Sequence, residues 1–175
     1  MPGNSFIKFD GVKEGESFQS NRDGKQGWIE IGDWSWDIEA ETSFTKGGGA
    51  AVGKPTPGTL SFSHFYDLSS PVIMAKIVGG QHFPVVVIDM LKQTGDKGGL
   101  PSQYFQIKMK EVFITKVSSK GGEDGSVNQD VEMVFKEVAV GYKPQKNDGT
   151  LEAPTDFNWN IARMNLATSI QNDWK

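Results

Sequence analysis

The feature that most constrains this chain is the repeated alternation of apolar and polar residues between clusters of glycine, proline, asparagine and aspartate. Alternation with a period of two places apolar side chains on one face of an extended strand, and the intervening residues favour turns. The pattern predicts strands near residues 5–9, 28–38, 59–66, 83–91, 103–117, 129–142 and 157–162. No repeat or linker-like stretch divides the 175 residues. We therefore expect one mainly β domain, a barrel or a sandwich.

Three of these strands carry apolar residues on both faces. In the strand at 28–38 the apolar positions change parity at Gly32 and Asp33, where a bulge would reset the facing. Similar changes occur within 103–117 and 129–142. A strand of an isolated sandwich keeps one face in water. The pattern therefore indicates either the corners of a closed barrel or a second buried face, one that could belong to a neighbouring subunit.

One short helix is expected at LSSPVIMAKIVGG, residues 68–80. Ser70 suits the cap, Pro71 the first helical position and the two glycines the end. Only Lys76 is charged between them, whereas a surface helix normally has a wide polar face. The helix either caps its own barrel or packs between that barrel and the next copy. We favour the second interpretation, with Ile73, Ile77 and Val78 as candidate interface residues.

Composition excludes several classes of function. The net charge of -4 gives no general attraction to nucleic acid, and no apolar run is long enough to span a bilayer. Without cysteine there is no disulfide or thiolate metal site. The first ten residues, MPGNSFIKFD, lack the pattern of a secretory signal, so we expect synthesis in the cytoplasm without a signal peptide.

Motifs for catalysis or cofactor binding are weak. GGAAVGK, residues 48–54, satisfies the glycine spacing of a phosphate loop, but Pro55 follows and cannot open the required helix. The two histidines, His64 and His82, lack the convergent carboxylates of a zinc site, and His64 shares parity with core residues. The carboxylate pairs Glu39/Glu41 and Glu123/Asp124 lie in or beside loops. We expect no catalytic residue, no cofactor and no metal.

The tryptophans offer an alternative function. Trp34 and Trp36 point to one face of their strand and Ser35 to the other. A core aromatic pair is the simpler interpretation. The alternative is a carbohydrate-binding β-sandwich module that exposes these rings to stack on sugars. Ser35 would then lie on a small polar face with Asp33 and Asp37, suited to lining a wet cavity.

An ordered series of segments resembles the haemolysin-coregulated protein family, the tube protein of bacterial type VI secretion. The segments are FIKFDGVKEGES at 6–17, GWIEIGDWSW at 27–36, the strand, helix and strand at 60–90, YKPQKNDGT at 142–150 and FNWNI at 157–161. Each segment alone is common, but the five in order are specific. The resemblance covers residues 1–163 as one domain. The tail at 164–175 departs from the pattern and could be a packed or a disordered extension.

The resemblance implies an antiparallel β-barrel of two sheets with one short flanking helix, assembling into a hexameric ring. The rings stack into a tube that a contractile sheath expels to the cell exterior or into a target cell. The implied partners are further copies of the chain, the spike protein, the sheath and effector proteins in the lumen. The serine of the family's W-S-W strand corresponds to Ser35, which we expect to contact cargo.

Ring stacking is expected to use the glycine-rich segment at 41–58, interpreted as a flexible loop. The candidate stacking residues are Gly47, Gly48, Gly49 and Lys54. Ordering such a loop on a neighbour costs about 1 kcal/mol per residue, which would keep stacking weak until many rings align.

Overall fold

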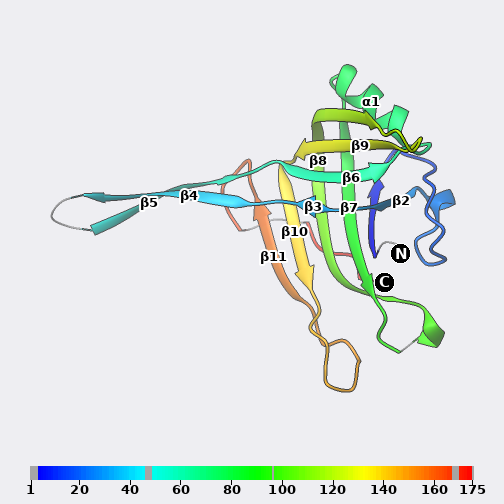
Figure 1. Ribbon diagram of the computed structural model, residues 1–175. Coiled ribbons are helices and arrows are strands. Elements are labelled where there is room, and N and C mark those ends of the chain that lie inside the picture. The colour runs from blue at the N-terminus through cyan, green and yellow to red at the C-terminus, as the bar shows by residue number, and fades with distance from the viewer. Residues whose placement is uncertain (1–3, 46–48, 96, 167–169, 175) are drawn as a thin grey trace.

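The structure is a computed structural model that describes residues 4–45, 49–95, 97–166 and 170–174. It is mainly β with one helix, as predicted, in two antiparallel sheets (Figure 1). The strands are β1 (Ser5–Phe9), β2 (Trp28–Ile31), β3 (Trp34–Ser35), β4 (Ile38–Thr45), β5 (Gly49–Pro57), β6 (Leu60–Phe65), β7 (His82–Lys92), β8 (Ser102–Gly121), β9 (Val127–Val134), β10 (Glu137–Tyr142) and β11 (Thr155–Asn160). The helix α1 spans Ser70–Val78, and short 3-10 turns lie at Gly24–Gln26 and Lys97–Gly99.

Nine strands form the main sheet in the order β2-β1-β7-β8-β9-β6-β3, and β10 pairs with β8 and β11. The two ends of this order, β2 and β3, are consecutive in the chain and are joined through Gly32 and Asp33. There the Gly32 N–H donates to the Ser63 carbonyl at 2.7 Å, and the Ser63 N–H donates to the Asp33 carbonyl at 3.1 Å. The sheet therefore curves until its two ends meet at the predicted change of parity.

Corners explain the apolar residues on both faces of the long strands. β8 first pairs with β7 and β10 and then continues along β9. Its direction changes near Glu111, whose φ of 50° lies in the left-handed region, and its register with β9 shifts between Ile114 and Lys116. The predicted strand at 129–142 is likewise two strands, β9 and β10, interrupted at 135–136. Side chains on opposite parities can thus reach the same core.

The main core fills the inside of the curved sheet. Its fully buried members come from most of the strands and from α1, and include Ile7, Phe9, Leu60, Ile73, Phe83, Ile88, Ile107, Met109 and Met133. A smaller cluster of Phe6, Trp28 and Leu91 lies apart from it. The second cluster lies beside the loop before β2, where Arg22 stacks over the Trp28 ring at 5.1 Å. The face of the sheet that carries Phe6, Trp28 and Leu91 is therefore covered in part by the loop before β2 of the same chain.

The segment at 41–58 is not the flexible loop that the sequence analysis predicted. Strands β4 and β5 pair in an antiparallel hairpin that projects away from the body (Figure 1). The glycines suggested a flexible loop, but residues 49–57 form β5, which contains Pro55 and Pro57. Proline cannot donate to a sheet, and β5 pairs on one side only, with β4. The prolines are tolerated because the free edge does not require their missing N–H groups.

Candidate functional site

A polar face covers the outside of β3, β6, β9 and the second half of β8. Ser35 and Ser61 are cross-strand partners whose hydroxyl oxygens lie 2.9 Å apart, and Ser61 lies opposite Glu132 on β9. The surrounding hollow of about 330 Å³ is lined by Asp33, Ser35, Ser61, Ser63, Lys116, Ser118, Asp130 and Glu132 among others. Ser35 is exposed on this polar face, next to Asp33, as predicted. The small side chains leave the face open to an incoming molecule.

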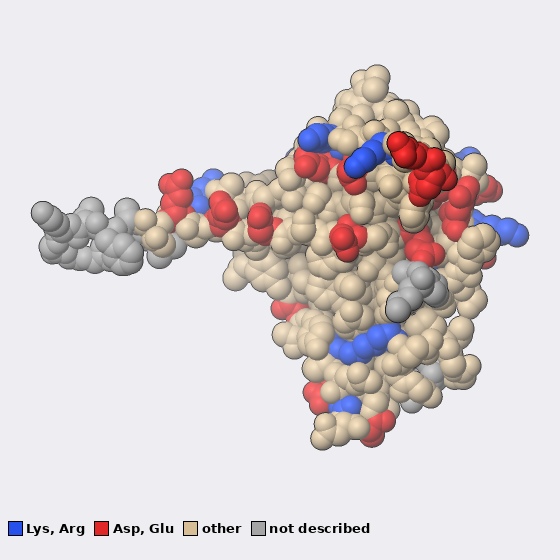
Figure 2. Space-filling model, viewed as in Figure 1, with Lys and Arg blue, Asp and Glu red and all other residues tan. Residues whose placement is uncertain are grey.

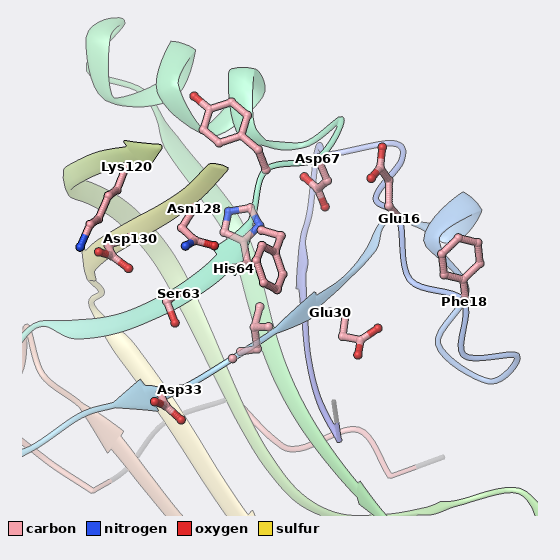
Figure 3. A pocket seen from close by; sticks show the side chains of 14 residues that line it. Glu16, Phe18, Glu30, Asp33, Ser63, His64, Asp67, Lys120, Asn128 and Asp130 are labelled. Atoms are coloured by element: carbon pink, nitrogen blue, oxygen red, sulfur yellow. The ribbon is translucent and has the colours of Figure 1, made fainter. Parts of the chain in front are cut away.

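An acidic cleft of about 760 Å³ adjoins the polar face (Figure 3). Figure 3 shows that its labelled residues come from the loop before β2, from β2, from β6 and from the β8–β9 hairpin. Its carboxylates are Glu16, Glu30, Asp33, Asp67 and Asp130, beside one cation, Lys120. The rim carries Phe18, which is 98% exposed. This arrangement favours basic groups on whatever lies against it.

Helix α1 has a buried side and an exposed apolar side. Ile73 is 0% exposed, so it is not an open interface residue, contrary to the prediction. Ile77 is half-buried and packs on the core, and its interface role stays a prediction. Val78 differs, with an exposed fraction of 88%. The exposed apolar positions follow helical spacing and form a stripe of Pro71, Met74, Ala75 and Val78, here called the α1 stripe. Figure 2 shows the surface over α1, at the top of the view, as uncharged.

The orientation of α1 depends on how the helix begins. The sequence shows that α1 is apolar nearly all round, with Lys76 as its one charged residue. It does not show which side of the helix faces the sheet. The helix begins at Ser70, one residue after the cap Ser69, and the Ser70 hydroxyl accepts a hydrogen bond from the Asp67 N–H at 3.1 Å. This contact helps to turn Ser70, Ile73 and Ile77 toward the core and the α1 stripe toward solvent.

A second apolar surface lies at the root of the β4–β5 hairpin. This apolar groove is lined by Trp34, Trp36, Ile38, Phe105, Ile107, Val140 and Phe157. Ile38 and Phe157 are 42% and 38% exposed. The Trp34 ring stacks on Phe105 at 5.5 Å, and the Trp36 indole N–H donates to the Gly58 carbonyl at 3.2 Å. Both indoles are half-buried and pack against the core, as the simpler interpretation of a core aromatic pair predicted, while their remaining surface lines this groove.

Two of the four candidate stacking residues, Gly49 and Lys54, lie on the β4–β5 hairpin. Gly49 begins β5 and Lys54 is an exposed residue of the same strand. Gly47 and Gly48 lie outside the described residues. Because the two strands are already paired, the loss of entropy on contact with a neighbour would be smaller than the flexible-loop prediction assumed. The strand also excludes a phosphate loop at 48–54, which requires a helix after the glycines.

His64 and Asp124 make contacts that hold the local structure. His64 is 4% exposed and its Nε2 lies 2.6 Å from the Gln129 side-chain oxygen, as predicted for a hydrogen-bonded core histidine. Asp124 accepts hydrogen bonds from the hydroxyl and the N–H of Ser126, which lower the pKa of the aspartate and hold a turn. Among the described residues, no three histidines or carboxylates lie close enough to share a metal ion. None of the described helices is long and apolar enough to cross a membrane.

A buried polar network was missed by the sequence analysis. The Arg22 Nε donates to Asp89 Oδ2 at 2.8 Å, and the side chains of Gln103 and Gln106 donate to Asp89 Oδ1 at 3.0 and 2.8 Å. Burial raises the pKa of Asp89, and the Arg22 charge and the two glutamines oppose that shift. The available signal was the lone carboxylate in the apolar run VVVIDML at 85–91. A charge in such a strand requires a buried partner.

Comparison with known proteins places this architecture in a family. The family model described as type VI secretion system effector, Hcp, matches residues 6–142. "Protein hcp1" of Pseudomonas aeruginosa is 35% identical over 105 residues, which are 58% of this chain and 62% of that protein. The match thus spans less than two thirds of that relative.

Solved structures share the fold over nearly the whole chain. A structure described as a type six secretion system protein has a TM-score of 0.81 and 24% identity, covering 92% of this chain and 97% of that one. Hcp1 from Salmonella typhimurium has a TM-score of 0.73 and 25% identity, covering 94% and 98%. Because the family model matches most of its length, the chain belongs to the family of type VI secretion system effectors, Hcp.

Proposed function

We propose that this protein is a structural subunit of the type VI secretion tube, which forms hexameric rings that stack and carry effectors in their lumen. Membership of the family supports a role in type VI secretion. The exposed α1 stripe is the observation that supports assembly of several copies into a ring. A helix that is buried on one side and apolar on the other leaves unfavourable contact with water, which a second protein layer removes. The proposed role is assembly and transport rather than catalysis.

Ring closure requires a heterologous contact between two different surfaces of the chain. Among the exposed apolar surfaces of the described residues are the α1 stripe and the apolar groove at the root of the hairpin. We place the α1 stripe of one copy against the apolar groove of the next. Ridge and groove then bury each other, and the same contact repeated with a constant rotation closes a ring.

The polar face suits the lumen. Ser35, Ser61 and Ser63 are small and polar, and a wall made of them presents few apolar contacts to a passing protein. Ser35 is the proposed cargo contact. The acidic cleft beside it adds negative charge, so this surface favours effectors with basic patches. Selectivity would then depend on charge more than on shape.

The β4–β5 hairpin is the proposed stacking element. It projects from the body, as a contact to an adjacent ring requires (Figure 1). Among the described residues, β4 and β5 pair only with each other, so the outer edge of each strand can pair with another chain. Lys54, on β5, is exposed. The contractile sheath and the spike protein would meet the assembled tube rather than the single chain. We propose synthesis in the bacterial cytoplasm and export by the type VI machinery.

Cysteine trapping tests the proposed ring contact, since the chain has no cysteine of its own. The double variant Val78→Cys/Ile38→Cys pairs the α1 stripe with the apolar groove. Under oxidation it should give a ladder of covalent species up to six chains, whereas each single variant should stay monomeric on a denaturing gel. A six-chain mass in solution without any ladder would place the ring contact elsewhere. A monomeric mass would reject the proposed function itself.

A further inference from the structure

The C-terminal residues 170–174 lie on a groove formed by β8 and β10, beyond the range that the family model matches. The sheet beneath them is complete. β8 pairs with β7 and β10, and β10 pairs with β8 and β11, so the tail supplies no missing strand. Ile170 is buried, at 1% exposed, and the polar contacts of the following residues are made mainly to side chains and to two strand carbonyl groups. This is the pattern of a bound ligand rather than of a structural strand.

The backbone of Asp173 is recognised on both sides. Its N–H donates to the Gln106 side-chain oxygen at 2.7 Å, and its carbonyl accepts from the Gln106 and Gln103 side-chain nitrogens at 2.9 and 3.2 Å. The same two nitrogens donate to buried Asp89. Asp89 and its partner Arg22 therefore hold both glutamines in position before any peptide arrives, which reduces the entropy lost on binding.

The side chains of the tail are also recognised. The Asn172 amide nitrogen donates to the carbonyls of Ala139 and Gln106 at 3.0 and 3.2 Å. The Asp173 carboxylate lies 2.8 Å from the Lys108 ammonium group. The Trp174 ring lies 4.6 Å below the Lys143 ammonium group, a cation–π contact. Each of the three positions thus contributes a different kind of contact.

Gly141 on β10 provides the space for this segment. A β carbon at Gly141 would lie 2.4 Å from Trp174 Cζ2 and 2.8 Å from Asn172 Oδ1, and the three nearest atoms it would meet all belong to the tail. The glycine is therefore required by the occupant of the groove and not by the packing of the strand. Gly121 on β8 offers a matched comparison, because a β carbon there meets nothing within 4 Å.

We propose that this groove is a specific peptide-binding site for an extended Asn-Asp-Trp segment. The chain's own residues 172–174 occupy it, and the same sequence supplied in trans by a second copy can replace them. A tethered segment reaches an effective concentration of about millimolar, so the resident tail excludes free peptide until its own contacts are weakened.

The test uses the full chain with Asn172→Ala/Trp174→Ala, here called the tail variant, and a fluorescein-labelled peptide SIQNDWK measured by fluorescence anisotropy. The tail variant should bind the peptide, and the unmodified protein should not at micromolar concentrations. Gly141→Ala added to the tail variant should abolish binding, and Gly121→Ala added instead should leave it intact. A peptide with Asn replaced by Ala should bind about tenfold more weakly, the loss expected for a hydrogen bond.

Three outcomes would overturn the proposal. One is a tail variant with unchanged circular dichroism that fails to bind the peptide even at millimolar concentration. Another is equal binding by the Gly141→Ala and Gly121→Ala forms, since recognition would then occur elsewhere. The third is unfolding of the tail variant, which would make the tail part of the core and not a separable ligand.

Discussion

Arg22 and Asp89 form an ion pair of 2.8 Å that is almost fully buried and joins the loop before β2 to the middle of the sheet. Asp89 in turn orients Gln103 and Gln106, which hold the C-terminal segment. Two segments that are far apart in the sequence, the loop and the tail, are thus positioned by one carboxylate. The loop before β2 and residues 170–174 thus lie against β7 and β8 through contacts that involve Asp89.

Removing one partner of the pair should be costly. Arg22→Met leaves Asp89 either ionised without its partner or protonated, and we expect a loss of about 3–5 kcal/mol in the free energy of unfolding. Urea denaturation measures the change. Lys136→Met is the matched control, because the Lys136–Glu111 pair is exposed and its loss should barely change stability. Equal effects of the two substitutions would show that burial of the Arg22 pair is unimportant.

The same carboxylate predicts a dependence of stability on pH. Burial raises the pKa of Asp89 above its ordinary 3.8, against the opposing Arg22 charge. The folded chain therefore binds a proton where the unfolded chain has lost it, and the stabilising contribution of this group is present at low pH and lost as pH rises through the folded pKa. The difference in unfolding free energy between the unmodified protein and Arg22→Met/Asp89→Leu should fall across that interval. A flat difference would mean that the pKa is unshifted.

The two sides of α1 should respond differently to a charge. Val78→Asp lies on the exposed α1 stripe, so the folded chain should keep its stability to within about 0.5 kcal/mol while ring formation is lost. Ile73→Asp places a carboxylate in the core and should cost several kcal/mol. Thermal unfolding and light scattering separate the two effects. Ala153→Asp, at an exposed alanine before β11, is the control for added charge. Intact rings with Val78→Asp would remove the α1 stripe from the interface.

The hairpin should affect tubes and not rings. Replacing residues 43–51 with Asn-Gly joins the cross-strand partners Thr42 and Val52 by a two-residue turn and keeps the root of the ribbon. We expect six-chain rings of normal stability and shorter or fewer tubes in negative-stain images. Normal tubes would show that stacking uses another surface. Loss of the rings would place the hairpin in the ring contact instead.

The sequence predicted most strands because alternation survives wherever one face is buried. β1, β6, β7 and β8 lie close to their predicted ranges. It predicted a bulge or corner at Gly32 and Asp33, where the two ends of the sheet meet. The β4–β5 hairpin was missed because β5, GAAVGKPTP, carries no alternation and contains prolines, which a ribbon that projects from the body and pairs on one side tolerates.

The side on which a residue lies was predicted correctly for a strand and incorrectly for a helix. Ser35 was assigned correctly to a polar face because strand parity fixes the side on which a residue lies. Ile73 was assigned to the wrong side of α1, because a helix with apolar residues nearly all round gives no sign of which side faces the core. The groove for the tail depends on Gln103, Gln106 and Gly141, whose roles arise only when distant segments meet.

Assembly into a hexameric ring can be measured as the mass of the purified protein, by size-exclusion chromatography with light scattering. The chain has a mass of 19.2 kDa, and we expect a particle of six times that mass with a ring shape in negative stain. A stable monomer across a wide range of protein concentration would contradict it, since the α1 stripe would then have no partner to cover it.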